Sequence, residues 1–128
     1  IDFNDNGCKH LTIIEEAHRV MSKCDNQELP QYKSAMMFSN MLSEIRAYGE
    51  GLLLVDQVPT RLIPDAIKNT NLKIIHRLVA EDDAKAIGES MGLSKEQRMI
   101  IPKLLTGQCV INSSLSTDTY WLKVNKVK

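Results

Sequence analysis

The sequence is poor in the features that mark secreted or membrane-spanning chains. It has three cysteines, Cys8, Cys24 and Cys109, and no C-x-x-C pair, so neither a disulfide framework nor a zinc site is indicated. We therefore expect three reduced thiols in a cytoplasmic protein. No apolar run approaches the roughly 20 residues that span a bilayer, and no signal peptide is visible.

Neither sign of charge is in excess. Lysine plus arginine is 16 and aspartate plus glutamate is 16, so the formal net charge is zero. This balance removes any whole-chain electrostatic argument for binding nucleic acid or an anionic membrane, although a local basic face could still form on folding.

Glycine-rich nucleotide-binding signatures are also missing. No G-x-x-x-x-G-K-[ST] loop is present, and no two of the six glycines are five positions apart. Gly49-Glu50-Gly51 is not a dinucleotide fingerprint, because Leu54 stands where the third glycine would be. Neither a G-x-S-x-G elbow nor an H-E-x-x-H helix occurs. The sequence thus lacks the loop that cradles phosphate.

Length and patterning favour one domain, 1–128, with a modest core. The chain begins with Ile1, from which we expect a piece of something longer or a processed product. Short apolar runs predict strands at 11–14, 52–55 and 72–79, and a hairpin at 108–112 and 119–124. Helical spacing predicts helices at 31–48 and 82–91, each followed by a glycine, and a short helix or turn at 60–68. Ser94 and Gln97 form a capping-box signature that opens another short helix.

Alternating strands and helices predict an α/β fold. The first strands are apolar on both faces, which is typical of a mostly parallel sheet covered by helices. The last two strands add an antiparallel hairpin at the C-terminal edge.

The strongest chemical signal is the string L-T-I-I-E-E-A-H from Leu11 to His18. It brings two carboxylates to the carboxyl end of a strand, where ligands bind in open α/β sheets. Nucleotide hydrolysis needs one acid to hold magnesium and another group to orient or deprotonate water. Neighbouring residues on a strand point to opposite sides, so we assign Glu15 to the metal and Glu16 to the water. The alternative is a solvated pair that opens a helix.

Other polar residues are weaker candidates. Gln57 ends the next apolar strand and could sense a γ-phosphate, or could be an ordinary turn residue before Pro59. Arg46 and Arg77 could reach phosphate through their forked guanidinium groups. Arg46 could equally complement the negative end of its helix, and Arg77 could pair with Glu81 or Asp82. Two histidines, His18 and His76, are more often structural than catalytic in such positions.

Together these blocks resemble the HerA/FtsK superfamily of P-loop motor ATPases, most closely its HerA-like and conjugation-ATPase branch. L-T-I-I-E-E-A-H is similar to the Walker B strand of that family, and E-I-R-A-Y-G-E-G-L-L-L-V-D-Q-V-P is similar to its next block. A-I-K-N-T-N-L-K-I-I-H-R-L and L-L-T-G-Q-C-V-I are similar to the two blocks that follow. The order and spacing match from about residue 11 to residue 111.

The resemblance implies a RecA-like P-loop NTPase sheet, incomplete because the Walker A half is absent. It implies ATP and Mg²⁺ as cofactors, with Glu15 on the metal side, Glu16 as catalytic glutamate and Gln57 as polar sensor. Arg46, and less strongly Arg77, would reach the nucleotide of a neighbouring subunit. The family typically forms hexameric rings that move DNA or protein.

Two departures qualify this expectation. Glu15 stands where aspartate is often seen, and the strand that leads into the phosphate loop, central in this superfamily, is missing. Because the sheet then has a gap with unpaired edges, we expect the isolated 128 residues not to hydrolyse ATP and to dimerise or exchange strands.

Two rival interpretations stay open. A DEAH-type helicase would share E-E-A-H, but the next strand ends in Asp56-Gln57 instead of the Ser-Ala-Thr type motif usual there. A non-catalytic assembly module with a degenerate ATPase fold would explain the missing loop. The sequence leaves open what would be moved.

Overall fold

The computed structural model describes residues 8–126, apart from the side chains of Ser43, Arg46 and Ala47. The chain divides into two compact units, residues 1–69 and residues 70–128, and each is described by itself. No helix among the described residues is both long enough and apolar enough to cross a membrane.

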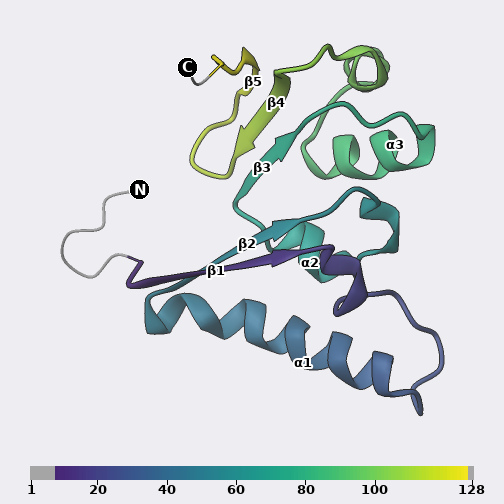
Figure 1. Ribbon diagram of the computed structural model, residues 1–128, viewed down its shortest axis with the longest axis vertical. Helices are drawn as coiled ribbons and strands as arrows, with labels where there is room; N and C mark the ends of the chain where they lie inside the picture. The colour runs from purple at the N-terminus through teal and green to yellow at the C-terminus, as the bar shows by residue number, and fades with distance from the viewer. Residues whose placement is uncertain (1–7, 127–128) are drawn as a thin grey trace. The chain divides into compact units, whose positions relative to one another are not determined.

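Unit 1 is built around two parallel strands. β1 (His10–Glu15) pairs with β2 (Glu50–Val55) in register from His10↔Glu50 to Glu15↔Val55. Parallel strands cannot be joined by a tight turn, and here the crossover runs through η1 (Ala17–Arg19), α1 (Pro30–Glu44) and η2 (Ile45–Tyr48). After β2 come η3 (Pro59–Arg61) and α2 (Pro64–Lys68). Figure 1 shows α1 running alongside the β1–β2 pair.

The ends of the long helix follow from its sequence. Pro30 occupies the first helical position, where its missing N–H has no cost. The helix continues through η2 to Gly49, whose φ of 73° is left-handed and readily adopted by glycine. The helix predicted at 31–48 is therefore confirmed, with its last turn in the 3-10 conformation.

Only one face of the β1–β2 pair is covered. Ile14, Leu52 and Leu54 pack, together with Phe38 and Leu42 of α1, against a buried cluster. That cluster consists of Ala17, Met21, Leu62 and Ala66.

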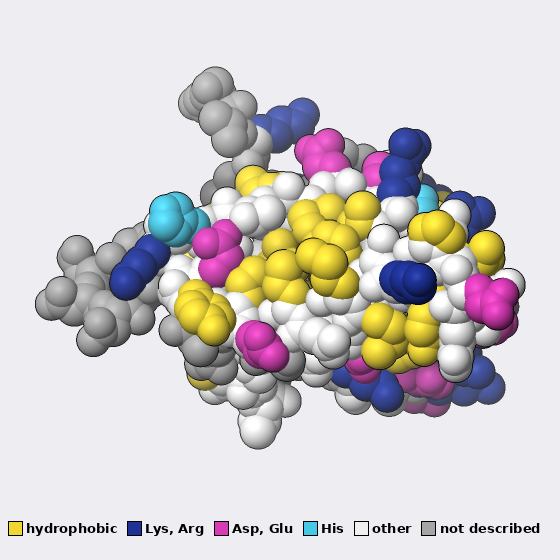
Figure 2. All heavy atoms as spheres, turned by 90° about the horizontal axis from the view of Figure 1, so that it is seen from below, with side chains coloured by type: hydrophobic (Ala, Val, Ile, Leu, Met, Phe, Trp, Pro, Cys, Tyr) yellow, Lys and Arg dark blue, Asp and Glu magenta, His cyan; other side chains and the backbone are white. Residues whose placement is uncertain are grey.

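The opposite face is exposed in the described structure. It carries Leu11, Ile13, Leu53 and Val55, and Ile13 is 57% exposed. The helices of unit 1 pack on the other face, so in the described residues this sheet is flanked by helices on one side. Seen from the side on which α1 lies, hydrophobic side chains also gather near the centre of the surface (Figure 2), and Met36 and Met37 of α1 are exposed.

Unit 2 is an antiparallel sheet with short helices. Its elements are β3 (Leu72–Ile75), α3 (Glu81–Ser90), α4 (Lys95–Arg98), η4 (Ile101–Lys103), β4 (Gln108–Ser113) and β5 (Thr119–Lys123). The strand order is β3-β4-β5, which confirms the C-terminal hairpin. The core consists of Ile75, Ala84, Met91, Leu93, Ile101, Leu104 and Val110.

The helix ends of unit 2 obey local rules. Ser94 and Gln97 form the predicted capping box at α4. At the end of α3, Leu93 N–H donates to Gly88 O and Gly92 N–H donates to Glu89 O, while Gly92 has a φ of 69°. This is a Schellman motif, which confirms the predicted stop.

The third strand is shorter than predicted. β3 ends at Ile75 instead of residue 79, so Arg77 lies in the segment after the strand. The antiparallel ladder stops at the pair Ile75↔Val110, and the side chain of His76 comes within 3.1 Å of Gln108 O through its Nδ1.

The α/β class is confirmed, as one parallel pair and one antiparallel sheet flanked by helices. Within the described residues β1 and β2 pair only with each other, and β3 pairs only with β4. Each sheet therefore has unpaired edges, as expected for an incomplete P-loop fold.

Candidate active site

The two predicted acids lie at the carboxyl end of β1. Glu15 is the last residue of the strand, is exposed, and alternates onto the open face with Leu11 and Ile13. Glu16 follows the strand and has φ 52° and ψ 47°, the left-handed conformation. It is the one non-glycine residue with positive φ among those described. We expected Glu15 and Glu16 to point to opposite sides of one continuous strand. The strand instead ends at Glu15, and the left-handed turn at Glu16 sets the direction of the second carboxylate.

Asp56, which directly follows β2, is the most hydrogen-bonded acid of the site. Its carboxylate accepts from His18 N–H at 2.7 Å and from Val58 N–H at 2.7 Å. The Nδ1 of His18 lies 2.9 Å from Oδ2 and 3.2 Å from Oδ1. The Asp56 side chain is only 5% exposed, and these donors compensate for its loss of water.

The same contacts decide the charge of Asp56. Burial by itself raises the pKa of this carboxyl group, but hydrogen bonds from Val58 and His18 and the nearby His18 ring outweigh that effect. The pKa of Asp56 is therefore lowered from its ordinary value, and the side chain is a carboxylate at neutral pH.

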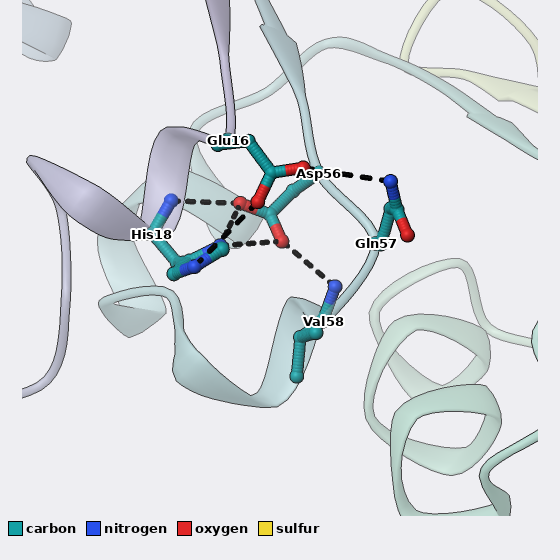
Figure 3. Close-up of polar contacts among 5 residues, drawn as sticks. All are labelled: Glu16, His18, Asp56, Gln57 and Val58. Atoms are coloured by element: carbon teal, nitrogen blue, oxygen red, sulfur yellow. Dashed lines mark hydrogen bonds and ion pairs between the residues drawn. The ribbon is translucent and has the colours of Figure 1, made fainter.

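Glu16 lies between two polar side chains (Figure 3). Gln57 Nε2 donates to Glu16 Oε1 at 3.4 Å, and His18 Nε2 lies 3.8 Å from Glu16 Oε2. The Glu16 side chain remains 41% exposed, so the carboxylate is accessible. A carboxylate with a donor on one side and a ring nitrogen on the other can orient a water or accept a proton from it.

The predicted residues have different outcomes. The structure brings Glu15, Glu16 and Gln57 to the same end of the β1–β2 pair. Arg46 lies in η2, and its side chain is outside the described part of the structure. Arg77 belongs to unit 2, is exposed, and donates from Nε to Pro102 O at 3.0 Å, instead of pairing with Glu81 or Asp82.

Two residues of the site were undervalued from the sequence. His18 was treated as structural and Asp56 only as a strand end, yet they form the tightest side-chain pair here. They are 38 positions apart, so no local pattern links them. The available signal was the parallel alignment itself, since each follows a strand whose last residues, Glu15 and Val55, are paired.

The residues at this site suit a magnesium ion that is shared with a bound nucleotide. Among the described residues no group of three or more His, Cys, Asp or Glu side chains could hold a metal ion. Mg²⁺ commonly keeps several waters and takes one or two carboxylates plus substrate phosphates. The exposed Glu15 carboxylate at the strand end suits that mode, and would need phosphate from a bound nucleotide.

The fold is that of P-loop NTPases. A genome packaging NTPase of Sulfolobus turreted icosahedral virus 2, solved with ATP-gammaS, superposes with a TM-score of 0.67 at 22% identity. The match covers 91% of this chain and 52% of the viral one. No protein-family model matches the chain.

Sequence relatives make the relationship more specific. The chain is 34% identical over 117 residues to a probable helicase of Methanocaldococcus jannaschii, covering 91% of this chain and 22% of the relative. It is 30% identical over 125 residues to the DNA double-strand break repair helicase HerA of Sulfolobus acidocaldarius, covering 95% and 24%. The resemblance to the HerA/FtsK superfamily is thereby confirmed, and the chain spans about a quarter or less of the curated relatives it matches.

Proposed function

We propose that the chain is the C-terminal portion of an ATP-hydrolysing motor of the HerA type, in which Glu16 activates the attacking water. The observation that carries this proposal is the placement of the Glu16 carboxylate, accessible and held between Gln57 and His18 at the carboxyl end of two parallel strands. Phosphoryl transfer depends on positioning and electrostatics, and this arrangement offers both.

The other residues receive complementary roles in the proposal. Glu15 holds Mg²⁺ through water, and the ion would neutralise charge on the phosphates. Gln57 contacts the γ-phosphate or the attacking water through its amide, in addition to Glu16. Arg46 and Arg77 are candidates to reach the nucleotide of a neighbouring subunit in a ring of identical chains. DNA is the proposed partner of the full-length protein, because the HerA relatives are named as DNA double-strand break repair helicases.

The half of the ATPase core that carries the phosphate-binding Walker A loop is supplied by a segment outside these 128 residues. Its strand would pair with an unpaired edge such as that of β2. We accordingly expect the 128 residues alone to lack ATPase activity and to dimerise or exchange strands. Placement in the cytoplasm remains a prediction.

The test is Mg²⁺-dependent ATP hydrolysis by the full-length protein that contains this chain. Glu16→Gln should lower kcat by about 100-fold to 10,000-fold while nucleotide binding is kept, because removal of a general base has effects of that size. Glu50→Gln is the matched control. Glu50 lies at the other end of β2, where it accepts a hydrogen bond from Thr12, and its substitution should change kcat by less than about twofold.

Either of two results would overturn the proposal. One is full activity in Glu16→Gln, and the other is a full-length protein without ATPase activity. The exposed apolar face of β1 and β2 would then favour the second candidate, a non-catalytic assembly module.

A further inference from the structure

We propose that His18 and Asp56 form a positioning pair for Glu16: Asp56 fixes the His18 ring, and the ring holds the Glu16 carboxylate on the side opposite Gln57. This inference rests on the proposed function, because it names what places the catalytic carboxylate. The proposed function gives no role to Asp56, and it mentions His18 only as a neighbour of Glu16.

Asp56 holds His18 at two points. The carboxylate accepts from both the backbone N–H and the ring Nδ1 of the same histidine. Because the Asp56 carboxylate binds both the backbone N–H and the ring of His18, the orientation of the ring is fixed relative to the His18 backbone. The Val58 N–H in turn fixes the carboxylate, so the arrangement does not depend on His18 alone.

The same contacts select the ring tautomer. An ionised carboxylate only accepts hydrogen bonds, so the proton lies on the His18 nitrogen that faces it, Nδ1. The Nε2 is therefore directed toward Glu16, at 3.8 Å from Oε2. This distance is longer than a direct hydrogen bond, and an unprotonated Nε2 has no proton to donate, so the ring acts by limiting where the carboxylate can lie.

Glu16 needs such support because its own backbone does not provide it. A left-handed conformation is unfavourable for a non-glycine residue such as Glu16 and persists only where its surroundings impose it. The hydrogen bond that Gln57 donates to its side chain, at 3.4 Å, is long. A misplacement of about 1 Å in an active site can lower the rate about 100-fold, so a second support has a functional consequence.

The chain contains a matched pair of the same chemistry. His10 and Glu50 join the beginnings of the same two strands, with Nδ1 3.6 Å from Oε2. His10 is 79% exposed, whereas His18 is 15% exposed. The two pairs therefore separate the effect of a buried, multiply bonded pair from that of any histidine–carboxylate contact between β1 and β2.

The experiment is a double-mutant cycle on steady-state ATP hydrolysis by the full-length protein. Asp56→Asn and His18→Asn should each lower kcat about 10-fold to 100-fold with the KM for ATP changed by less than about threefold. In the Glu16→Gln background the same substitutions should have no further effect on kcat, since the group they position is gone. His10→Asn should behave like the wild type in both backgrounds.

The outcomes separate this inference from the proposed function. If Glu16→Gln leaves kcat intact, the proposed function fails. If Glu16→Gln abolishes hydrolysis but Asp56→Asn and His18→Asn keep wild-type kcat, or lower it equally in both backgrounds, the positioning pair is wrong and the proposed function stands. Should Asp56→Asn not fold, His18→Asn decides, because it keeps the backbone N–H donated to Asp56.

Discussion

The two units of the chain obey the rules of local structure to different degrees. Unit 2 has an apolar core, a capping box at α4 and a Schellman motif at the end of α3. Unit 1 has a left-handed glutamate, Glu16, an aspartate, Asp56, whose side chain is only 5% exposed, and a strand pair with one open apolar face. Unit 2 also contains a buried aspartate, Asp83, and exposed apolar strand residues such as Ile74, so the left-handed Glu16 and the hydrogen-bonded Asp56 are what set unit 1 apart. The irregular features of unit 1 coincide with the proposed active site, apart from its open face.

This difference indicates where the sequence serves function more than stability. Proteins tend to depart from local rules at functional sites and to compensate elsewhere. A left-handed Glu16 and an ionised, largely desolvated Asp56 carboxylate each have a cost that apolar packing does not. We therefore predict that each unit responds to substitutions of its own stabilising residues, and hydrogen–deuterium exchange with peptide resolution can follow the two units separately.

The largest expected effect is on the core of unit 2. Ile101 is fully buried, so Ile101→Ala should lower the free energy of opening of unit 2 by about 2–5 kcal/mol. Amides of α3 and β4 should lose protection, with unit 1 unaffected. The adjacent Ile100 is 46% exposed, and Ile100→Ala is the control. Equal effects of the two substitutions would contradict the assigned core.

The next effect is on the polar centre of unit 1. Asp56→Ala removes the acceptor of the His18 and Val58 N–H groups, and each donor left unsatisfied costs about 1–3 kcal/mol. Protection should fall around η1 and the end of β2. The exposed Asp25→Ala should change the free energy of opening by less than about 0.5 kcal/mol. Unchanged protection in Asp56→Ala would show that the pair does not hold unit 1 together.

A smaller and sharper comparison uses two left-handed residues. Gly92→Ala should destabilise the end of α3 by about 1 kcal/mol, because alanine is strained at a φ of 69°. Glu16→Gly should instead leave unit 1 as stable or slightly more stable, while abolishing hydrolysis in the full-length protein. Glu16→Ala, which keeps the strain and loses the carboxylate, separates the two effects. Marked destabilisation by Glu16→Gly would mean that Glu16 is structural.

The smallest effect is the pH dependence of unit 1. Because the folded-state pKa of Asp56 is lowered, its contribution to stability is complete above the ordinary aspartate pKa of about 3.9 and is lost as pH falls through the lowered value. In acid denaturation monitored by circular dichroism, Asp56→Asn should therefore show a shallower loss of stability below about pH 4. An identical slope in wild type and variant would contradict the assigned charge.

Local signals in the sequence predicted much of this fold. Gly49, Gly92 and the Ser94–Gln97 pair marked helix ends, and the structure confirms each of them. The length of β3 and the exposed face of β1 were not predictable, because both depend on which neighbours are present. An apolar strand has the same sequence whether its second face is covered or open.

The site shows the same limit. Glu15, Glu16 and Gln57 could be found because they follow apolar strands, and the structure places them at one end of the β1–β2 pair. The contact between His18 and Asp56 joins residues 38 positions apart, and its strength comes from burial that no local pattern reports. The roles of all these residues stay predictions.

The most direct test of the central claim is a structure of the full-length protein with Mg²⁺ and a non-hydrolysable ATP analogue. We predict the γ-phosphate opposite Glu16, with His18 and Gln57 on either side of that carboxylate, Glu15 on the metal side, and an additional strand paired with β2. A nucleotide bound away from the carboxyl end of β1, or a Glu16 carboxylate directed away from the phosphates, would contradict it.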